Sequence, residues 1–221
     1  MQWKLFLQIA GVGVGALYLY AQTAETPSLP KPATVNEAAQ GVPPRAAPTD
    51  YPAKTKLGTF TLAAEFAGHG LPAPEGLVTT EDYVTVEVAF YGPAGSQLQL
   101  SQSDFSLRIN SKKTPLPSLP FERVGQNARD PEWVPPEKPE KPKTSIGGGG
   151  GDTAPAPVKP PPELQRAWFQ RVRRAALPEG NRPLPQAGLL YFPYGGKEKG
   201  IRSLELIYSG AAGKATLDLQ P

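Results

Sequence analysis

The stretch EDYVTVEVAFYG, residues 81–92, is the clearest strand in the chain and sets the fold class. Successive side chains of a strand point to opposite faces of its sheet, so an alternation of period two predicts one buried face. Its β-branched residues favour the same conformation. Apolar and intervening side chains alternate as follows: Val84, Val86, Val88 and Phe90 against Thr85, Glu87 and Ala89.

Six further short segments on either side of this stretch repeat the alternation, and glycine, proline or other turn residues bound each of them. They lie within residues 57–66, 97–100, 105–109, 187–194, 201–210 and 214–220. About seven short strands predict an all-β fold, an immunoglobulin-like sandwich of two antiparallel sheets. We expect it to form one domain over residues 56–220.

Proline is unevenly distributed and marks an interruption of this domain. Thirteen of the 28 prolines lie in residues 115–162, together with five successive glycines at 147–151. We predict a low-complexity Pro/Gly-rich insert at about 112–162. Neither set of strands could bury its apolar face alone, and each doubling of loop length costs only about 0.6 kcal/mol. The insert is therefore expected to join two parts of a single sandwich.

The N-terminus has the composition of an export signal. Lys4 precedes an apolar run, and small residues follow at Ala21 and Ala24. We predict that residues 1–24 are a signal peptide; the alternative is a membrane anchor formed by residues 5–21. Both place the remaining chain outside the cytoplasm, in the periplasm, at the cell surface or secreted. Residues 25–55 are rich in proline and lack periodicity, which predicts a disordered linker.

One helix is expected, over about residues 163–177, because prolines precede this stretch and Pro-Glu-Gly follows it. It would either pack an apolar face on the sandwich or bind an anionic surface through its arginines. Trp133, in otherwise irregular sequence, is expected to dock on its own domain or on a partner. The candidate interaction residues are Trp133, Arg166, Trp168, Arg171, Arg173 and Arg174.

Groups able to perform catalysis are few. The chain has no cysteine, which excludes disulfides, thiolate metal sites and a cysteine nucleophile. The single histidine, His69, lies between glycines and is expected to be a loop residue, and no Gly-x-Ser-x-Gly motif accompanies it. We therefore predict no catalytic residue, no metal site and no cofactor. The net charge of +3 is too small for a nucleic-acid-binding surface.

Two stretches, YVTVEVAFYGPAGSQLQLSQSDFSLRINSKK (83–113) and AGLLYFPYGGKEKGIRSLELIY (187–208), resemble the telokin-like, immunoglobulin-like extracellular domains of exported bacterial proteins of unknown function. The resemblance covers about half of the chain. It implies an immunoglobulin-like fold and an exported location, and it carries over no catalytic residue. The long insert and the arginine-rich helix depart from the family's pattern. The residues that carry the likeness are Phe105, Leu107, Gly188, Phe192, Leu204 and Leu206.

These observations predict an exported, non-enzymatic immunoglobulin-like module that binds an envelope or extracellular protein or supports an assembly. The alternative is a peripheral binder of anionic lipid or envelope polymer, with the arginine-rich helix as its contact. Added salt would weaken that contact steeply, because exposed charges are screened. A hydrolase built on two carboxylates is the weakest hypothesis, since nothing in the sequence pairs them.

Overall fold

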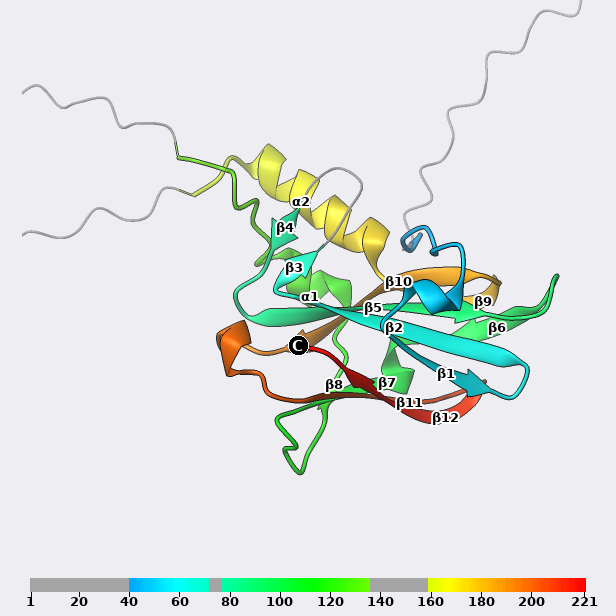
Figure 1. The fold of residues 1–221 in the computed structure, drawn as a ribbon. Helices are drawn as coiled ribbons and strands as arrows, with labels where there is room; N and C mark the ends of the chain where they lie inside the picture. Colours follow the sequence, from blue (N-terminus) through cyan, green and yellow to red (C-terminus); the bar gives the residue numbers. More distant parts are fainter. Residues whose placement is uncertain (1–39, 72–76, 136–158) are drawn as a thin grey trace, which may run out of the picture. The chain divides into compact units, whose positions relative to one another are not determined.

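A computed structural model of the chain describes residues 40–71, 77–135 and 159–221. Antiparallel strands dominate this part and form two four-stranded sheets and two short ribbons (Figure 1). The predicted signal or anchor segment, the linker up to residue 39 and the insert between residues 136 and 158 lie outside the described residues. None of the helices in the described ranges is long and apolar enough to span a membrane.

The strand that decided the fold class lies inside the first sheet. This strand, β5 (Tyr83–Tyr91), pairs with β2 (Phe60–Gly68) on one side and with β10 (Gln186–Pro193) on the other. β1 (Ala53–Leu57) extends the sheet beyond β2. Gly58, in the turn between β1 and β2, has a φ of +61°, a conformation that favours glycine. The strand order is β1-β2-β5-β10.

The second sheet has the order β12-β11-β7-β8. Its strands are β7 (Phe105–Ile109), β8 (Leu116–Pro117), β11 (Leu204–Gly210) and β12 (Gly213–Leu219). The ribbons are β3 (Gly70–Leu71) with β4 (Val78–Thr79), and β6 (Gln97–Leu100) with β9 (Gly180–Pro183). All seven strands expected from the alternation are present, which confirms an all-β sandwich. Five further strands, β1, β3, β4, β8 and β9, were not expected.

Both sheets combine strands from the two sides of the insert. In the first sheet β10 follows the insert and pairs with β5, which precedes it. In the second sheet β11 follows the insert and pairs with β7, which precedes it. The two parts of the chain are therefore interleaved, and neither supplies a complete sheet. This arrangement ties them together by backbone hydrogen bonds as well as by apolar packing.

The main core lies between the two sheets. The four alternating apolar residues of β5 are completely buried there. The ring of Phe90 packs edge-on against Tyr208, with centroids 5.3 Å apart, and against Phe105 at 6.1 Å. These aromatic contacts join the centre of the first sheet to both β7 and β11 of the second. Burial of each such side chain stabilises the fold by roughly 1.5–3 kcal/mol.

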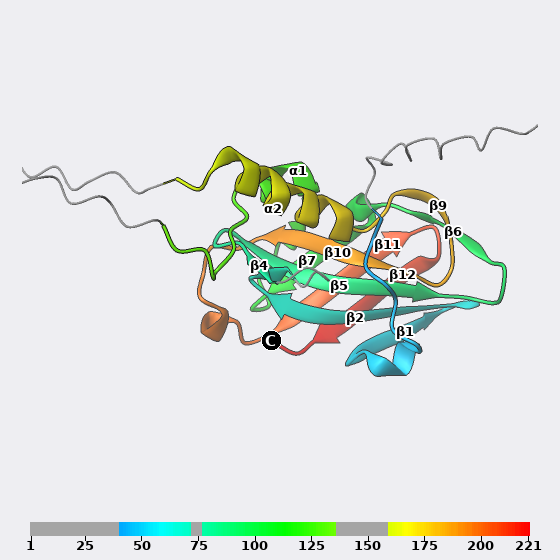
Figure 2. The ribbon, with the colours of Figure 1, turned by 90° about the horizontal axis from the view of Figure 1, so that it is seen from above.

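The other face of the first sheet is covered by helices. α1 (Phe121–Gly125) and α2 (Pro162–Ala175) lie on the side opposite the second sheet (Figures 1 and 2). Trp168 and Val172 of α2 pack with Leu189 and Tyr191 of β10 in a second apolar cluster. The Tyr191 hydroxyl donates to the Val172 carbonyl oxygen at 2.9 Å. The helix predicted over 163–177 is therefore present with slightly earlier bounds, and its apolar face packs on the sheet.

The segment of residues 40–52, the strap, crosses the same face beyond the helices and contains the 3-10 turn η1 (Pro48–Asp50). Its Val42 and Tyr51 pack on three buried alanines that lie side by side on β2, β5 and β10: Ala63, Ala89 and Ala187. The prediction of a disordered linker over 25–55 is thus wrong for residues 40–55. Two isolated apolar residues give no periodicity, so the sequence pattern could not reveal this contact.

The outward edge of β10 is paired with three separate segments. The carbonyl oxygens of residues 187, 189 and 191 accept hydrogen bonds from the backbone N–H groups of Val42, Leu177 and Leu119, at 3.1, 3.0 and 2.8 Å. An unpaired strand edge is a template for association with other chains, and covering it removes that hazard. The strap, the segment before α1 and the segment after α2 therefore replace a further strand.

The predicted insert, 112–162, is shorter than expected at its N-terminal end. Residues 112–135 contain β8, α1 and the Leu119 bridge to Tyr191. Phe121 of α1 packs edge-on against Phe169 of α2, with centroids 6.1 Å apart. A five-residue helix is too short to be stable alone, so tertiary contacts of this kind hold it. The prediction from proline-rich composition is therefore wrong for residues 112–135, which pack on the domain.

Because each sheet contains strands from both parts, cleavage in the insert should leave the domain intact. We expect that a protease site introduced between residues 136 and 158 yields two fragments that co-elute in native size-exclusion chromatography and separate only in denaturant. Two folded fragments that separate without denaturant would contradict the interleaved arrangement.

Candidate functional site

The two tryptophans predicted as contact residues pack on each other. Trp168 is only 3% exposed and belongs to the cluster between α2 and the first sheet. Trp133 is half-buried against the same cluster, and its ring meets Trp168 edge-on with centroids 6.3 Å apart. Trp168 is therefore a core residue, and Trp133 docks on its own domain. Leu164, one turn earlier on α2, is 37% exposed.

The arginines of α2 lie along the outer part of the helix. Arg166 and Arg174 are exposed, whereas Arg171 and Arg173 are half-buried. Arg166 donates through Nε to the carbonyl oxygen of Pro162 at 3.3 Å, which keeps its side chain along the first turn. The backbone carbonyl of Arg174 accepts the N–H groups of Gln40 and Gly41 at 3.1 and 2.9 Å. The C-terminal end of α2 thus anchors the start of the strap.

The densest group of charges is a polar clamp formed by Arg45, Tyr51, Glu65 and Glu87. Glu65 and Glu87 face each other on β2 and β5, where like charges repel. Arg45 of the strap forms an ion pair with Glu65, lies 3.5 Å from Glu87, and stacks 4.2 Å from the Tyr51 ring centroid. The Tyr51 hydroxyl donates to Glu87 at 2.8 Å. The clamp therefore neutralises a carboxylate pair and fastens the strap.

The surroundings of Tyr51 explain its ionisation state. Burial, followed by the hydrogen bond to the Glu87 carboxylate, raises the pKa of the Tyr51 hydroxyl well above its usual range. The phenol therefore stays protonated and continues to donate. The neighbouring Tyr91 hydroxyl donates to the backbone oxygen of Arg45 at 2.8 Å. These groups are occupied in structural contacts, so we assign the clamp a fastening role.

His69 joins three loops at one end of the domain. Its Nδ1 lies 2.7 Å from the Tyr83 carbonyl oxygen, and its Nε2 lies 2.9 Å from that of Gly196. The ring stacks on Tyr194 at a centroid distance of 6.1 Å, and the backbone N–H donates to Glu198 at 2.5 Å. Both ring nitrogens are engaged with backbone carbonyls. This agrees with the expectation of a loop residue.

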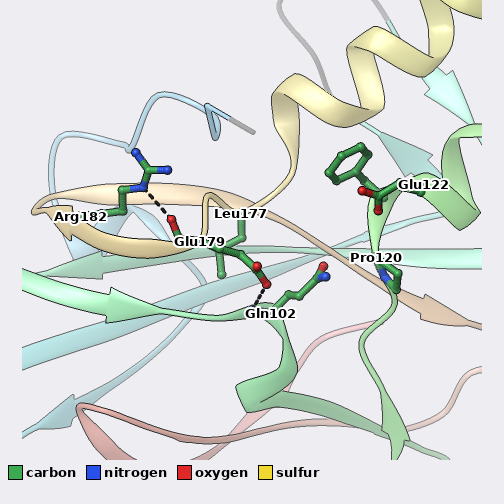
Figure 3. A pocket seen from close by; sticks show the side chains of 7 residues that line it. Gln102, Pro120, Glu122, Leu177, Glu179 and Arg182 are labelled. Atoms are coloured by element: carbon green, nitrogen blue, oxygen red, sulfur yellow. Dashed lines mark hydrogen bonds between the residues drawn. The ribbon is translucent and has the colours of Figure 1, made fainter. Parts of the chain in front are cut away.

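A recess of about 300 Å³ lies between the start of α1 and the segment that follows α2. Pro120, Phe121 and Leu177 supply apolar surface, and four polar side chains surround it. Figure 3 shows Glu122 and Arg182 at opposite ends of this pocket, with Glu179 and Gln102 between them. The pocket is lined by Gln102, Pro120, Phe121, Glu122, Leu177, Glu179 and Arg182.

Local structure holds the polar groups of the pocket in place. Gln102 begins the 3-10 turn η2 (Gln102–Asp104), whose preceding residue Ser101 accepts the Ser103 N–H through its hydroxyl. The backbone N–H of Gln102 donates to Glu179 Oε1 at 3.4 Å. Arg182 Nε donates to the Glu179 carbonyl oxygen at 2.9 Å. These bonds connect η2 to the segment after α2 and fix one wall of the pocket.

Negative charge accumulates on this side of the domain. Burial, and then the charge of Glu179, raise the pKa of the Asp104 carboxyl group at the end of η2. Glu122 and Glu179 form no ion pair with another residue of the described ranges, where the ion pairs involve Arg45, Arg108 and Arg129. The pocket therefore combines an apolar floor with carboxylates that lack a paired cation.

No local pattern in the sequence predicts this pocket. Its residues come from three stretches, around residues 102, 120–122 and 177–182, that meet only in the folded domain. The Pro-Glu-Gly stretch after the predicted helix was expected only to end that helix. None of the tryptophans or arginines proposed from the sequence lines the pocket. Only the strand pairing brings its walls together.

Known proteins offer no further guide to this site. No protein family model, curated protein or solved structure matches the chain. Within the described ranges, no group of three or more histidine or acidic side chains is arranged to hold a metal ion.

The polar clamp should contribute measurably to stability. We expect Arg45→Ala to lower the free energy of unfolding by about 1–2 kcal/mol, because it removes charge-assisted hydrogen bonds and leaves two carboxylates opposed. Arg129→Ala is the matched control, since its pair with Glu81 joins side chains that are 68% and 85% exposed and should contribute less than about 1 kcal/mol. Urea denaturation measures both. Equal losses would contradict the fastening role.

Proposed function

We propose that the sandwich is immunoglobulin-like. Immunoglobulin domains place strands A, B and E in one sheet and C, F and G in the other. The order β2-β5-β10 in the first sheet and β12-β11-β7 in the second corresponds to A-B-E and G-F-C. β8, beside β7, then takes the position of an additional edge strand. Strand D, which lies next to E, would be replaced by the three segments that pair with β10.

Its function, on this proposal, is non-enzymatic binding of another protein, outside the cytoplasm. The pocket between α1 and the segment after α2 is the observation that carries the proposal, because it offers apolar surface ringed by polar groups. The strongest polar contacts elsewhere, in the clamp and around His69, fasten loops and the strap. The location rests on the export-signal composition of residues 1–24.

The alternative, binding of anionic lipid or polymer by α2, has less support. Amphipathic helices that bind membranes insert their apolar face among the lipids. In α2 that face, with Trp168 and Val172, is buried on the first sheet. A contact through α2 would therefore depend on its arginines alone. Such a contact would be weak at physiological salt.

Affinity capture from envelope extract, with the full chain as bait, tests the proposal at low and high salt. Gln102→Trp fills the pocket while keeping its carboxylates, and Gln170→Trp places the same ring on the exposed side of α2. We expect a protein that is retained at high salt by the wild type and by Gln170→Trp, and lost with Gln102→Trp. Matching thermal unfolding curves would show that both variants fold.

Two outcomes would contradict the proposal. Material that is released by salt and lost only with Gln170→Trp would favour the arginine face of α2. Recovery of no partner at either salt concentration would favour a purely structural role.

A further inference from the structure

We propose that the pocket binds a lysine or arginine side chain presented by the partner protein. This inference rests on the proposed function, because it specifies the group that the module would recognise. It is drawn from the charge of the pocket, the character of its apolar surface and its size. Each of these properties excludes a different class of ligand.

The charge of the pocket favours a cation. Two carboxylates, Glu122 and Glu179, and one guanidinium, Arg182, line the pocket, so the lining carries a formal charge of −1. Arg182 is already hydrogen-bonded through Nε to the Glu179 carbonyl oxygen. The complete chain carries +3, so this acidic recess is opposite in sign to the protein as a whole. An anionic ligand would meet two carboxylates, whereas a cation would be attracted at short range.

A third carboxyl group, behind the wall of the pocket, supports the same conclusion. Asp104 ends η2, and burial and the Glu179 charge favour its protonated form. Asp104 and Glu179 thus repel each other when both are ionised. A cation placed beside Glu179 would offset that repulsion. A neutral ligand would partly desolvate Glu122 and Glu179 without bringing a cation to either carboxylate, which is unfavourable.

The apolar surface and the size of the pocket indicate which cation fits. Pro120, Phe121 and Leu177 would contact the aliphatic stem of a lysine or arginine side chain, while its charged end reaches the carboxylates. The Phe121 ring adds an aromatic surface that attracts cations. A volume of about 300 Å³ lies at the lower limit of small-ligand pockets. It suits one long side chain better than a folded element or a cofactor.

Nuclear magnetic resonance titration of the isotope-labelled full chain tests the inference. The probes are three capped tripeptides, identical except that the central residue is lysine, norleucine or glutamate. We expect saturable shifts of the backbone amides at Gln102, Phe121, Glu122 and Glu179 with the lysine peptide alone. The peptide concentration is raised to about 10 mM, which detects dissociation constants in the millimolar range. Equal shifts with the norleucine peptide, or no shifts with the lysine peptide, would overturn the inference that the pocket binds a cationic side chain.

Charge-removing variants sharpen this test. Glu122→Gln and Glu179→Gln should each weaken binding of the lysine peptide by about fivefold, whereas Glu163→Gln, at the exposed start of α2, should leave it unchanged. An equal effect of Glu163→Gln would show that the peptide responds to the overall charge of the protein and not to the pocket, and would overturn the inference. Pentylamine serves as a further probe. Tighter binding of this free amine than of the peptide would assign the pocket to a small molecule and overturn it as well.

The capture experiment separates this inference from the proposed function. If the captured protein is lost with Gln102→Trp but retained by the double variant Glu122→Gln/Glu179→Gln, the module binds protein without a cation, and only the present inference fails. If the double variant also loses the captured protein, the proposed function and the present inference are both supported.

Discussion

β10 ends the first sheet, and its outward carbonyl groups need hydrogen-bond donors that no further strand provides. Three segments supply them: the strap through Val42, the approach to α1 through Leu119 and the exit from α2 through Leu177. Each segment is irregular in sequence, and each is held where it meets this edge by side chains that pack nearby. The clamp fixes the strap, and the Trp168 cluster fixes α2. Closing this one strand edge thus positions the three segments that cover much of the outer face of the sheet.

The sequence predicted what periodicity can encode. Alternation located the strands at Val84–Phe90 and Phe105–Ile109, and the apolar stripe through Trp168 located α2. Periodicity failed where single side chains, and no repeating pattern, hold a segment on the domain. Tyr51 and Val42 made the strap part of the domain without any pattern, and proline-rich sequence concealed α1 and Leu119. Periodicity could not predict the strand order either. The pairs β5–β10 and β7–β11 join residues about a hundred positions apart in the sequence.

The same limit explains why the candidate site was missed. Trp168 was a candidate contact residue because it lies on the predicted arginine-rich helix, yet it is buried. Glu122 fell within the predicted insert and Glu179 within the Pro-Glu-Gly stretch after the predicted helix. They share a pocket only because α1 and the segment after α2 both pack next to β10. The edge closure that stabilises the sandwich therefore also builds the recess to which we assign binding. Fold and proposed function depend on the same three segments.

Amide hydrogen exchange of the full chain, resolved by residue, tests this account most directly. If the three segments close the edge of β10, the amides of Val42, Leu119 and Leu177 should exchange as slowly as those paired between β5 and β10, since all would open only with the sheet. Exchange at the rate of exposed turn residues such as Gly95 would contradict the account. In that case β10 would have an open edge, and the pocket would lack a fixed wall.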